Sequence, residues 1–202
     1  MQALSAGQPT KRIGLLGGSF NPAHAGHVHI SRQARRHLDL DQVWWLVSPQ
    51  NPLKPERGMA PFRERIGAAR ATAEDSGVPI LVTAIEDEMG TRYSVDTLAA
   101  LKGRFPGHRF VWIMGADNLI QAHRWKDWRT FFRTVPIAVF SRPPYSSRAL
   151  KAKAAWYFAA ARWRQTRAAR LAGIRPPAWI FLRRGRHPAS ATGIRALGEN
   201  ER

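Results

Sequence analysis

The chain has 202 residues, a formal net charge of +18 and no cysteine. Its length suits one large domain, and its 44% of apolar residues suits a globular core. The lack of cysteine excludes disulfides and cysteine catalysis, and no apolar run reaches the roughly 18 to 20 residues of a transmembrane helix. We therefore expect one domain over residues 1–202 that binds no membrane. Residues 1–11 are expected to be a flexible tail without the features of a signal peptide, and the lack of cysteine fits a cytoplasmic protein.

The positive charge is concentrated in the last third of the chain. Between Trp128 and Gly198 there is no Asp or Glu, whereas fifteen Lys and Arg lie there. Such a field attracts nucleic acids, acidic membranes or phosphorylated small molecules. No DNA- or RNA-binding motif is present. Nucleic acid is therefore the less favoured partner, although a basic helix over residues 151–170 could bind RNA weakly or only keep the protein in solution.

Apolar runs and segments with helical spacing alternate along the chain. This pattern predicts an α/β fold, a doubly wound, Rossmann-like parallel sheet with helices on both faces and a basic helical segment over residues 146–175. Ser94 is expected to cap its helix, Trp125 to lie on a helix, and Glu86 to Glu88 to form a solvated strand end. The expected strands are residues 13–16, 43–47, 80–85, 110–114, 136–141 and 179–182, and the expected helices are residues 27–37, 61–76, a helix from 94 onward, 146–172 and a short one after 192.

Residues 17–27 read Gly-Gly-Ser-Phe-Asn-Pro-Ala-His-Ala-Gly-His. Gly17 and Gly18 end a strand and permit a tight turn, and a helix is expected from about Ala25. Backbone N–H groups at a helix start favour phosphate, and His24 and His27 could add donors. A zinc site would lack a third ligand nearby, because this segment has no Cys, Asp or Glu. The plainer alternative is a tight turn with two surface histidines.

Three later segments also follow expected strands, and the carboxyl ends of parallel strands are where open α/β sheets bind ligands. Lys54 lies in a proline-rich loop, and residues 115–119 form a second glycine turn. Ser190 or Thr192 can cap a final short helix, and Arg195 could bind phosphate oxygens. Each of these segments could instead be an ordinary solvated loop or helix cap.

Five segments in order resemble the bacterial nicotinate-nucleotide adenylyltransferases of the nucleotidylyltransferase superfamily. They are residues 17–27, the loop ending at Lys54, Arg92-Tyr-Ser-Val-Asp-Thr-Leu98, Gly115-Ala-Asp-Asn-Leu119 with Trp125 and Trp128, and Ser190-Ala-Thr-Gly-Ile-Arg195. Two departures stand out. Ala189 and Ala191 replace an Ile and a Ser of the usual terminal motif, and the loop Asn51-Pro-Leu-Lys54 lacks the usual His.

The resemblance implies transfer of the adenylyl group of ATP to nicotinate mononucleotide in NAD biosynthesis, with Mg²⁺ carried by the ATP phosphates and no metal held by the protein. It implies the catalytic residues His24, His27, Lys54 and Arg195. It implies an ATP site of Gly17, Gly18, Ser19, Phe20, His24, His27, Asp117, Ser190, Thr192 and Arg195. It implies an acceptor site of Asn21, Lys54, Thr91, Tyr93 and Trp125, although with eight tryptophans in the chain most are expected in the core.

Other acceptors remain alternatives, namely nicotinamide mononucleotide and pantetheine phosphate. The sequence does not decide between the acid and amide forms of the pyridine. It also leaves open whether the protein is a homo-oligomer.

Overall fold

The computed structural model describes residues 10–49, 58–142 and 144–183, so the expected sites at Lys54, Ser190, Thr192 and Arg195 lie outside the described residues. Within that part, seven strands form one sheet in the order β3-β2-β1-β4-β5-β7-β6, and every neighbouring pair is parallel. The predicted parallel α/β sheet is confirmed. The strands are β1 (Arg12–Gly18), β2 (Gln42–Val47), β3 (Ile80–Thr83), β4 (Arg109–Gly115), β5 (Ile137–Phe140), β6 (Arg162–Trp163) and β7 (Trp179–Leu182).

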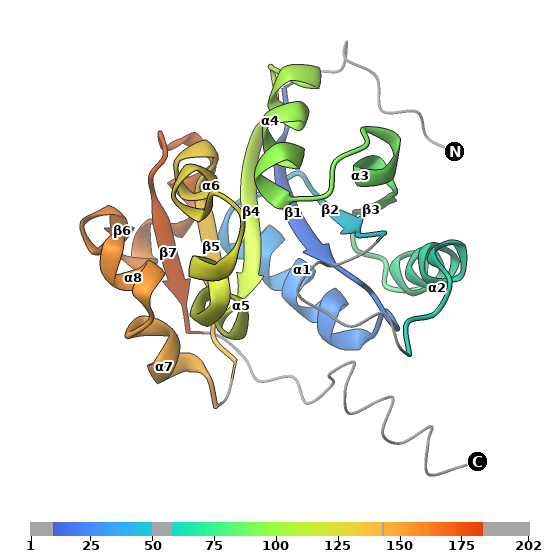
Figure 1. Cartoon of the computed structure of the whole chain (residues 1–202), viewed down its shortest axis with the longest axis horizontal. Helices are drawn as coiled ribbons and strands as arrows, with labels where there is room; N and C mark the ends of the chain where they lie inside the picture. The colour runs from blue at the N-terminus through green and yellow to red at the C-terminus, as the bar shows by residue number, and fades with distance from the viewer. Residues whose placement is uncertain (1–9, 50–57, 143, 184–202) are drawn as a thin grey trace.

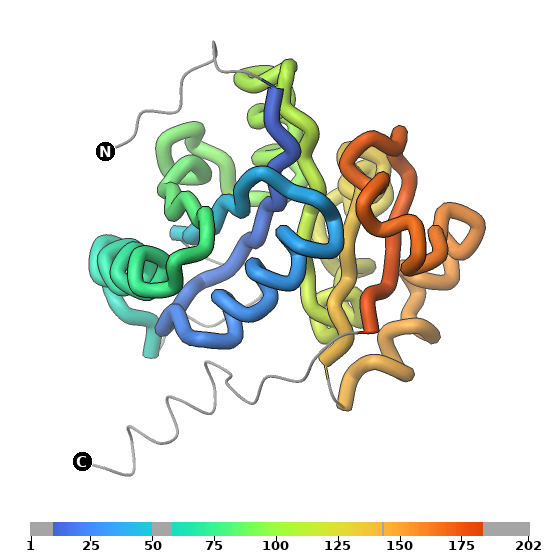
Figure 2. Tube along the Cα trace, turned by 180° about the vertical axis from the view of Figure 1, so that it is seen from behind, coloured from blue at the N-terminus to red at the C-terminus, as the bar shows by residue number. Residues whose placement is uncertain are grey.

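Helices cover both faces of this sheet (Figures 1 and 2). One face carries α4 (Ser94–Arg104), α5 (Ala116–Gln121), α6 (Trp128–Thr134), α7 (Ser146–Leu150) and α8 (Lys153–Tyr157). The other face carries α1 (Ala25–His37), α2 (Phe62–Glu74) and the 3₁₀ segment η3 (Gln165–Gly173). The remaining helices are α3 (Ile85–Glu88), η1 (Ala122–Arg124) and η2 (Ala159–Ala161). The sheet is therefore doubly wound, as predicted.

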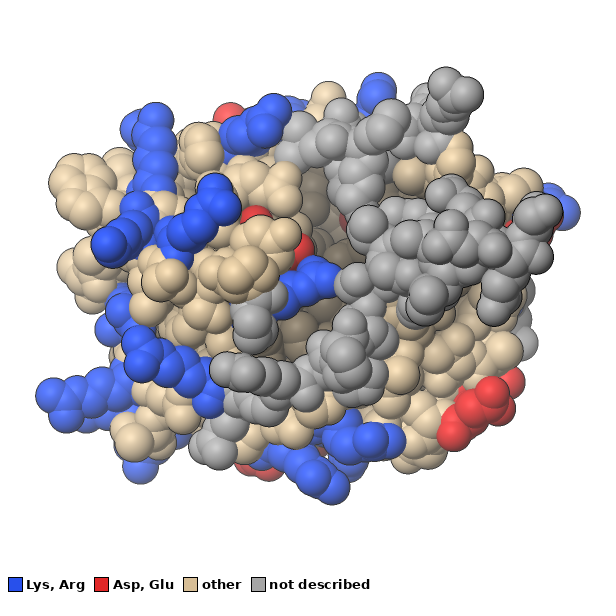
Figure 3. Space-filling view, turned by 90° about the horizontal axis from the view of Figure 1, so that it is seen from below, with Lys and Arg blue, Asp and Glu red and all other residues tan. Residues whose placement is uncertain are grey.

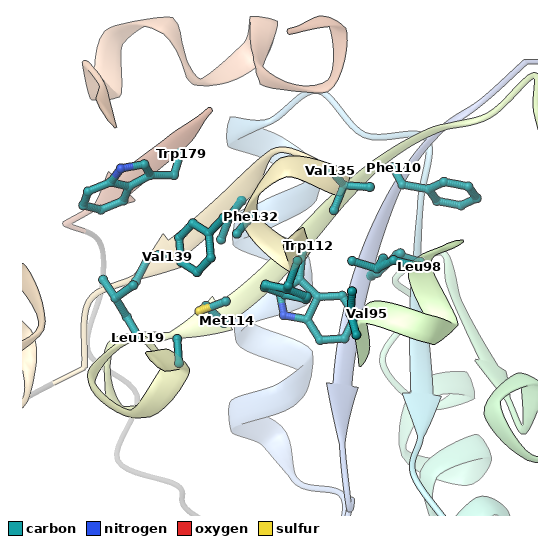
Figure 4. Packing of buried hydrophobic residues seen from close by; sticks show 14 of the residues in the cluster. Val95, Leu98, Phe110, Trp112, Met114, Leu119, Phe132, Val135, Val139 and Trp179 are labelled. Carbon is teal, nitrogen blue, oxygen red and sulfur yellow. The ribbon is translucent and has the colours of Figure 1, made fainter. Parts of the chain in front are cut away.

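The central strands are apolar throughout because both of their faces are buried. Successive side chains point to opposite faces of a strand, so Trp44 packs into the core on the α4 face and Trp45 into the core on the α1 face. On β4, Trp112 and Met114 pack beneath the helices, as Figure 4 shows. Two cores on a parallel sheet fix the register of the strands, and with it the position of every strand end.

The carboxyl ends of the strands lie together at the lower edge in Figure 1. From β1 the chain crosses to β2 on one side, whereas β4 pairs with β1 on the other side. This reversal leaves a crevice beyond the ends of β1 and β4, which is where open α/β sheets bind ligands.

Three expectations near this crevice are wrong. The third strand ends at Thr83, because the Thr83 hydroxyl accepts a hydrogen bond from the Ile85 amide (3.1 Å) and the chain turns into α3. Glu86 on α3 is then buried and is not part of a solvated strand end. Ser94 is the first residue of α4, and Tyr93 occupies the cap position.

Two helical expectations also fail. The segment 146–172 is not one helix, because residues 162–163 pair with β7 as an edge strand and so interrupt it. Tertiary hydrogen bonding overrides the helix propensity of this Ala- and Arg-rich stretch. Trp125 follows η1 in extended conformation (φ −74°, ψ 149°), so it lies on a loop and not on a helix.

Candidate active site

A cavity opens at the carboxyl edge of the sheet, between the ends of β1 and β4 and the segments around α3, α4 and η1. Figure 3 looks onto this edge and shows a hollow near its centre. The residues that line the cavity are Gly17, Gly18, Ser48, Glu86, Arg92, Tyr93, Ser94, Val95, Trp112, Asn118, Gln121, Arg124, Trp125, Lys126 and Phe131. The glycine turn and the aromatic wall, which lie about a hundred residues apart in the sequence, thus share one site.

The glycine turn is shaped by a tryptophan from the neighbouring strand. A Cβ on Gly17 would lie 2.8 Å from Cη2 of Trp112, so only glycine fits beside this ring. After the turn, Phe20 adopts a left-handed conformation (φ 45°) and buries its ring against Trp45, with 4.9 Å between the ring centroids. Phe20 can therefore offer a ligand its backbone but not its side chain.

His24 and His27 lie at the start of helix α1, where their ring nitrogens accept hydrogen bonds from backbone amides. His24 is the N-cap, and its Nδ1 accepts a hydrogen bond from the Gly26 amide (3.0 Å). Nδ1 of His27 accepts from the His24 amide (3.2 Å), which completes a capping box. With Nδ1 as acceptor, the neutral imidazole carries its proton on Nε2. The cap therefore sets the tautomer in which both rings present an Nε2–H donor.

The side chain of Asn21 connects the loop after β1 to the segment that leads into α2. Its Nδ2 donates to the Gly58 carbonyl (2.9 Å), and its Oδ1 accepts from the Ala60 amide (3.2 Å). Asn21 is buried and does not line the cavity. Its observed contacts position the loop.

Arg65 on α2 is a residue that the sequence analysis missed. The residue is only 3% exposed, and its guanidinium donates to the carbonyl oxygens of Ala60, Ser19, Ser48 and Pro49, at 2.6 to 2.9 Å. Burial lowers its pKa from the ordinary value. The sequence could have indicated its burial, because the helical spacing of Ile66, Ala69 and Ala73 predicts an apolar stripe and Arg65 lies next to this stripe.

Glu86 lies in the wall of the cavity and was also missed. The residue is 6% exposed, and its Oε1 accepts from the Thr97 hydroxyl at 3.4 Å. Burial raises its pKa to about 7, although hydrogen bonds from Ser48 and Thr97 favour the charged form. Thr97 also contacts Thr91, with 2.9 Å between the two hydroxyl oxygens. Thr91, which was predicted to bind the acceptor substrate, thus contacts a residue behind the cavity wall and does not itself line the cavity.

Another part of the cavity lining is aromatic and basic. Trp125 contacts Trp112 and Phe131 edge-on, with centroid distances of 6.5 and 5.1 Å. Lys126 lies 4.8 Å above the ring of Tyr93 and pairs with Asp96 at 3.0 Å. The hydrogen bond to Asp96 raises the pKa of Lys126.

Asp117 lies on the first turn of α5, just after β4. Its Oδ2 accepts from Arg142 at 2.9 Å, whereas the buried Oδ1 has no hydrogen-bond partner among the described residues. A Cβ on Gly115 would collide with Oδ1 of Asp117. The observed position of this carboxylate therefore requires glycine at residue 115. Within the described part of the chain, one acceptor atom of Asp117 at the strand edge is therefore unused.

Of the predicted site residues, the cavity brings together Gly17, Gly18, Tyr93 and Trp125. Ser19, Phe20, Asn21, His24, His27, Thr91 and Asp117 lie on the adjoining segments and do not line it. Among the described residues, no group of three or more His, Cys, Asp or Glu could hold a metal ion. No helix in the described part of the chain is both long and apolar enough to span a membrane.

A doubly wound parallel sheet whose first strand runs into a glycine turn and a histidine-capped helix is the arrangement of an α/β nucleotidyltransferase. The cytidylyltransferase-like family model matches residues 15–197. Proteins named "Probable nicotinate-nucleotide adenylyltransferase" are similar over nearly the whole chain. The one from Cereibacter sphaeroides is 53% identical and the alignment covers 92% of this chain and 97% of the relative. The one from Parvibaculum lavamentivorans is 52% identical, with 94% of each chain covered. The chain belongs to the nicotinate-nucleotide adenylyltransferase family.

Solved structures agree on the fold. Nicotinic acid mononucleotide adenylyltransferase of Plasmodium falciparum, in complex with NaAD, superposes with a TM-score of 0.67 at 15% identity. The superposition covers 92% of this chain and 83% of that one. The same enzyme in complex with APC gives a TM-score of 0.66.

Proposed function

We propose that the protein transfers the adenylyl group of ATP to nicotinate mononucleotide and releases pyrophosphate, as its family relationship indicates. The observation that carries the proposal is the shared cavity, which is lined both by the Gly17–Gly18 turn and by Tyr93 and Trp125. A glycine turn before a helix suits a phosphate, and an aromatic wall suits a planar ring. The cavity thus offers both kinds of contact that a pyridine mononucleotide needs.

The reaction needs little covalent help from the protein. A phosphate oxygen of the mononucleotide attacks the α-phosphorus of ATP, the new P–O bond forms, and the bond to the β-phosphate oxygen breaks. The attacking oxygen is already an anion, so no general base is required. The task is to align two polyanions and to stabilise the charge at the reacting phosphorus.

Residues of this chain are suited to that task. The backbone amides of residues 17–20 and the Nε2–H groups of His24 and His27 would donate to the triphosphate. Lys54 and Arg195, with Ser190 and Thr192, would add charge and donors from their own segments. We assign the unused oxygen of Asp117 to a ribose hydroxyl of ATP, since it is a buried acceptor at a strand end.

ATP would enter with Mg²⁺ on its phosphates. The described residues offer no cluster of carboxylates that could cage the ion by itself. Phosphate oxygens and water suit Mg²⁺ as ligands, so the cation would neutralise charge as part of the nucleotide.

The basic lining of the cavity favours the acid form of the pyridine. Arg92, Arg124 and Lys126 all line it, and Asp96 neutralises only Lys126 among them within the described residues. A carboxylate on the ring would be attracted by this field, whereas an amide would not. We therefore assign nicotinate mononucleotide over its amide counterpart.

A turnover assay tests the proposal. Purified protein is given MgATP with nicotinate mononucleotide, nicotinamide mononucleotide or pantetheine phosphate, and dinucleotide and pyrophosphate are measured. The acid form is expected to give the highest kcat/KM. Turnover with pantetheine phosphate and none with either pyridine would refute the proposal.

A further inference from the structure

The side of the molecule formed by α6 and α8 carries an unusual surface, far in sequence from the glycine turn. Trp156 is 77% exposed and Tyr157 is 40% exposed, and they are the large apolar side chains that stand out from the described surface. Basic side chains surround them, and Figure 3 shows Lys and Arg gathered on this side. We call it the basic aromatic face, composed of Arg129, Arg133, Lys153, Trp156, Tyr157 and Arg162.

Contacts between the helices hold these residues together. The guanidinium of Arg129 lies 4.7 Å from the centroid of the Tyr157 ring, so α6 and α8 meet there. Arg133 lies 5.6 Å above the ring of Phe158, which follows α8 directly. Lys153 is three and four residues before Trp156 and Tyr157 on α8, so it shares their side of the helix.

Arg162 joins the same face through the edge of the sheet. Its guanidinium lies 5.3 Å from the centroid of Trp179. The indole N–H of Trp179 donates to the Phe158 carbonyl at 2.7 Å. The three arginines are therefore fixed against rings, which lowers the entropy that a guanidinium loses when it binds an anion.

No ion pair among the described residues balances this charge. Residues 129–183 contain no Asp or Glu. Within residues 10–49, 58–142 and 144–183, the ion pairs join Arg12, Lys126 and Arg142 to aspartates, and none involves a residue of the basic aromatic face. The fixed charges are thus available to an external anion.

We propose that the basic aromatic face binds single-stranded nucleic acid, with phosphates on Arg129, Arg133, Lys153 and Arg162 and a base stacked on Trp156. Nonspecific single-strand binding combines a cationic track with exposed rings on which bases stack. A duplex would fit less well, because its bases are already stacked and cannot reach an indole. This site is separate from the cavity and does not depend on the function proposed for it.

Two other occupants fit the surface less well. A second copy of the chain would place another positively charged surface against this face, since the whole protein carries a charge of +18. Repulsion between like charges would oppose such a contact. An anionic membrane is bound by an amphipathic helix with an extended apolar stripe, whereas α8 has five residues and two exposed rings.

Fluorescence anisotropy tests the proposal with a fluorescein-labelled oligouridylate of about 12 nucleotides, a length that spans one such site. Saturating MgATP is included so that the cavity is filled. We expect a complex whose log affinity falls with log salt concentration with a slope of about −3, since four cations would each contribute roughly −0.7 on a single strand. Binding that MgATP abolishes would place the strand in the cavity and overturn the proposal.

Substitutions separate stacking from charge. Trp156→Ala is expected to weaken binding at least fivefold, on the order of the loss of one base stack, and Trp156→Phe to retain most of the affinity. Lys153→Gln is expected to make the salt slope less steep by about 0.7, whereas Arg36→Gln, an equal charge change on α1 on the opposite face of the sheet, leaves the slope unchanged. Because Trp156 is exposed, its variants are expected to keep the wild-type Tm and turnover.

Further results would also overturn the proposal. Equal affinity of wild type and Trp156→Ala would remove the base-stacking contact. If inorganic polyphosphate competes as effectively per phosphate as unlabelled oligouridylate, the face binds any polyanion and does not recognise bases. If no oligouridylate complex forms and the protein sediments with phosphatidylserine vesicles, the face binds a membrane. If no oligouridylate complex forms and the protein is a dimer that Trp156→Ala disrupts, the face binds a second copy of the chain.

Discussion

Arg65 and Ser19 are joined by a buried hydrogen bond, in which Nη1 of the guanidinium donates to the Ser19 carbonyl at 2.6 Å. The same nitrogen donates to the carbonyl of Ser48 at 2.8 Å. One side chain from α2 therefore ties the loop after β1 to the loop after β2. The conformation of the turn after β1 therefore depends on a residue that does not itself line the cavity.

Replacement of Arg65 tests this positioning role. Arg65→Lys keeps the positive charge but cannot reproduce the planar fork that satisfies four carbonyl groups. We expect the free energy of unfolding to fall by about 2 to 4 kcal/mol, because buried acceptors lose a charged donor. We also expect KM for ATP to rise as the turn after β1 loosens. Urea denaturation and steady-state kinetics measure the two effects.

Arg63→Lys is the matched control, since Arg63 lies on the same helix but is exposed. It is expected to match wild type in both measurements. A stable Arg65→Lys variant with normal KM would show that the loops do not need this connection.

The His24 cap leads to a second prediction. Nδ1 of His24 is occupied by the Gly26 amide, so any phosphate contact must use Nε2. His24→Asn keeps a good N-cap but has no group in place of Nε2. We expect kcat to fall by about a hundredfold, the usual scale for losing one donor to a developing charge, with little change in ATP affinity.

Comparison with His24→Ala separates the two roles of the ring. The alanine variant also loses the cap, so its free energy of unfolding is expected to be lower by about 1 kcal/mol than that of the asparagine variant. Equilibrium binding of a non-hydrolysable ATP analogue gives the affinity. Equal losses in ATP affinity and in kcat would mean that His24 acts on the ground state and not on the transition state.

The sequence predicted every described strand except β6, in the right order along the chain, because parallel strands buried on both faces leave clear apolar runs. Of the predicted site residues, Gly17, Gly18, Tyr93 and Trp125 line the cavity at the strand ends. The sequence did not predict the role of Glu86, since an acidic run after a strand usually lies in water and only the turn at Thr83 buries this residue. It did not predict the break in 146–172, because pairing of Trp163 with β7 involves residues far apart in the chain. Long-range contacts decided both cases.

Trp125 gives a third prediction. It lines the cavity beside Tyr93 and contacts Trp112 and Phe131 edge-on, and we expect its ring to stack on a planar ligand in the cavity. Trp125→Ala is expected to raise KM for the pyridine mononucleotide roughly tenfold or more, as loss of one aromatic stack does. KM for ATP should change little.

The pair Trp125→Phe and Trp128→Phe provides the control. Both remove an indole, but Trp128 packs against Phe132 and Phe158 and does not line the cavity. Trp125→Phe is expected to raise KM for the mononucleotide only partly, and Trp128→Phe to leave it unchanged. Matching KM values for the mononucleotide in Trp125→Ala and wild type would exclude stacking on this ring.

Glu86 gives a prediction about stability and pH. Burial raises its pKa from 4.5 to about 7, so between these values the folded protein holds a proton that the unfolded chain has released. The free energy of unfolding therefore falls as pH rises from about 4.5 to 7 and levels off above that. At about 1.36 kcal/mol for each pH unit, the full loss is about 3 kcal/mol.

Glu86→Gln removes the titration and keeps the shape of the side chain. Between about pH 5 and pH 8, the free energy of unfolding of this variant is expected to rise relative to wild type by up to about 3 kcal/mol. Glu88→Gln, on the same helix but exposed, should follow wild type at every pH. Urea denaturation at a series of pH values measures both differences. If the curves of Glu86→Gln and wild type run parallel, the Glu86 carboxyl is charged at neutral pH, and the wall of the cavity that it shares with Ser48 and Thr97 is negative and not neutral.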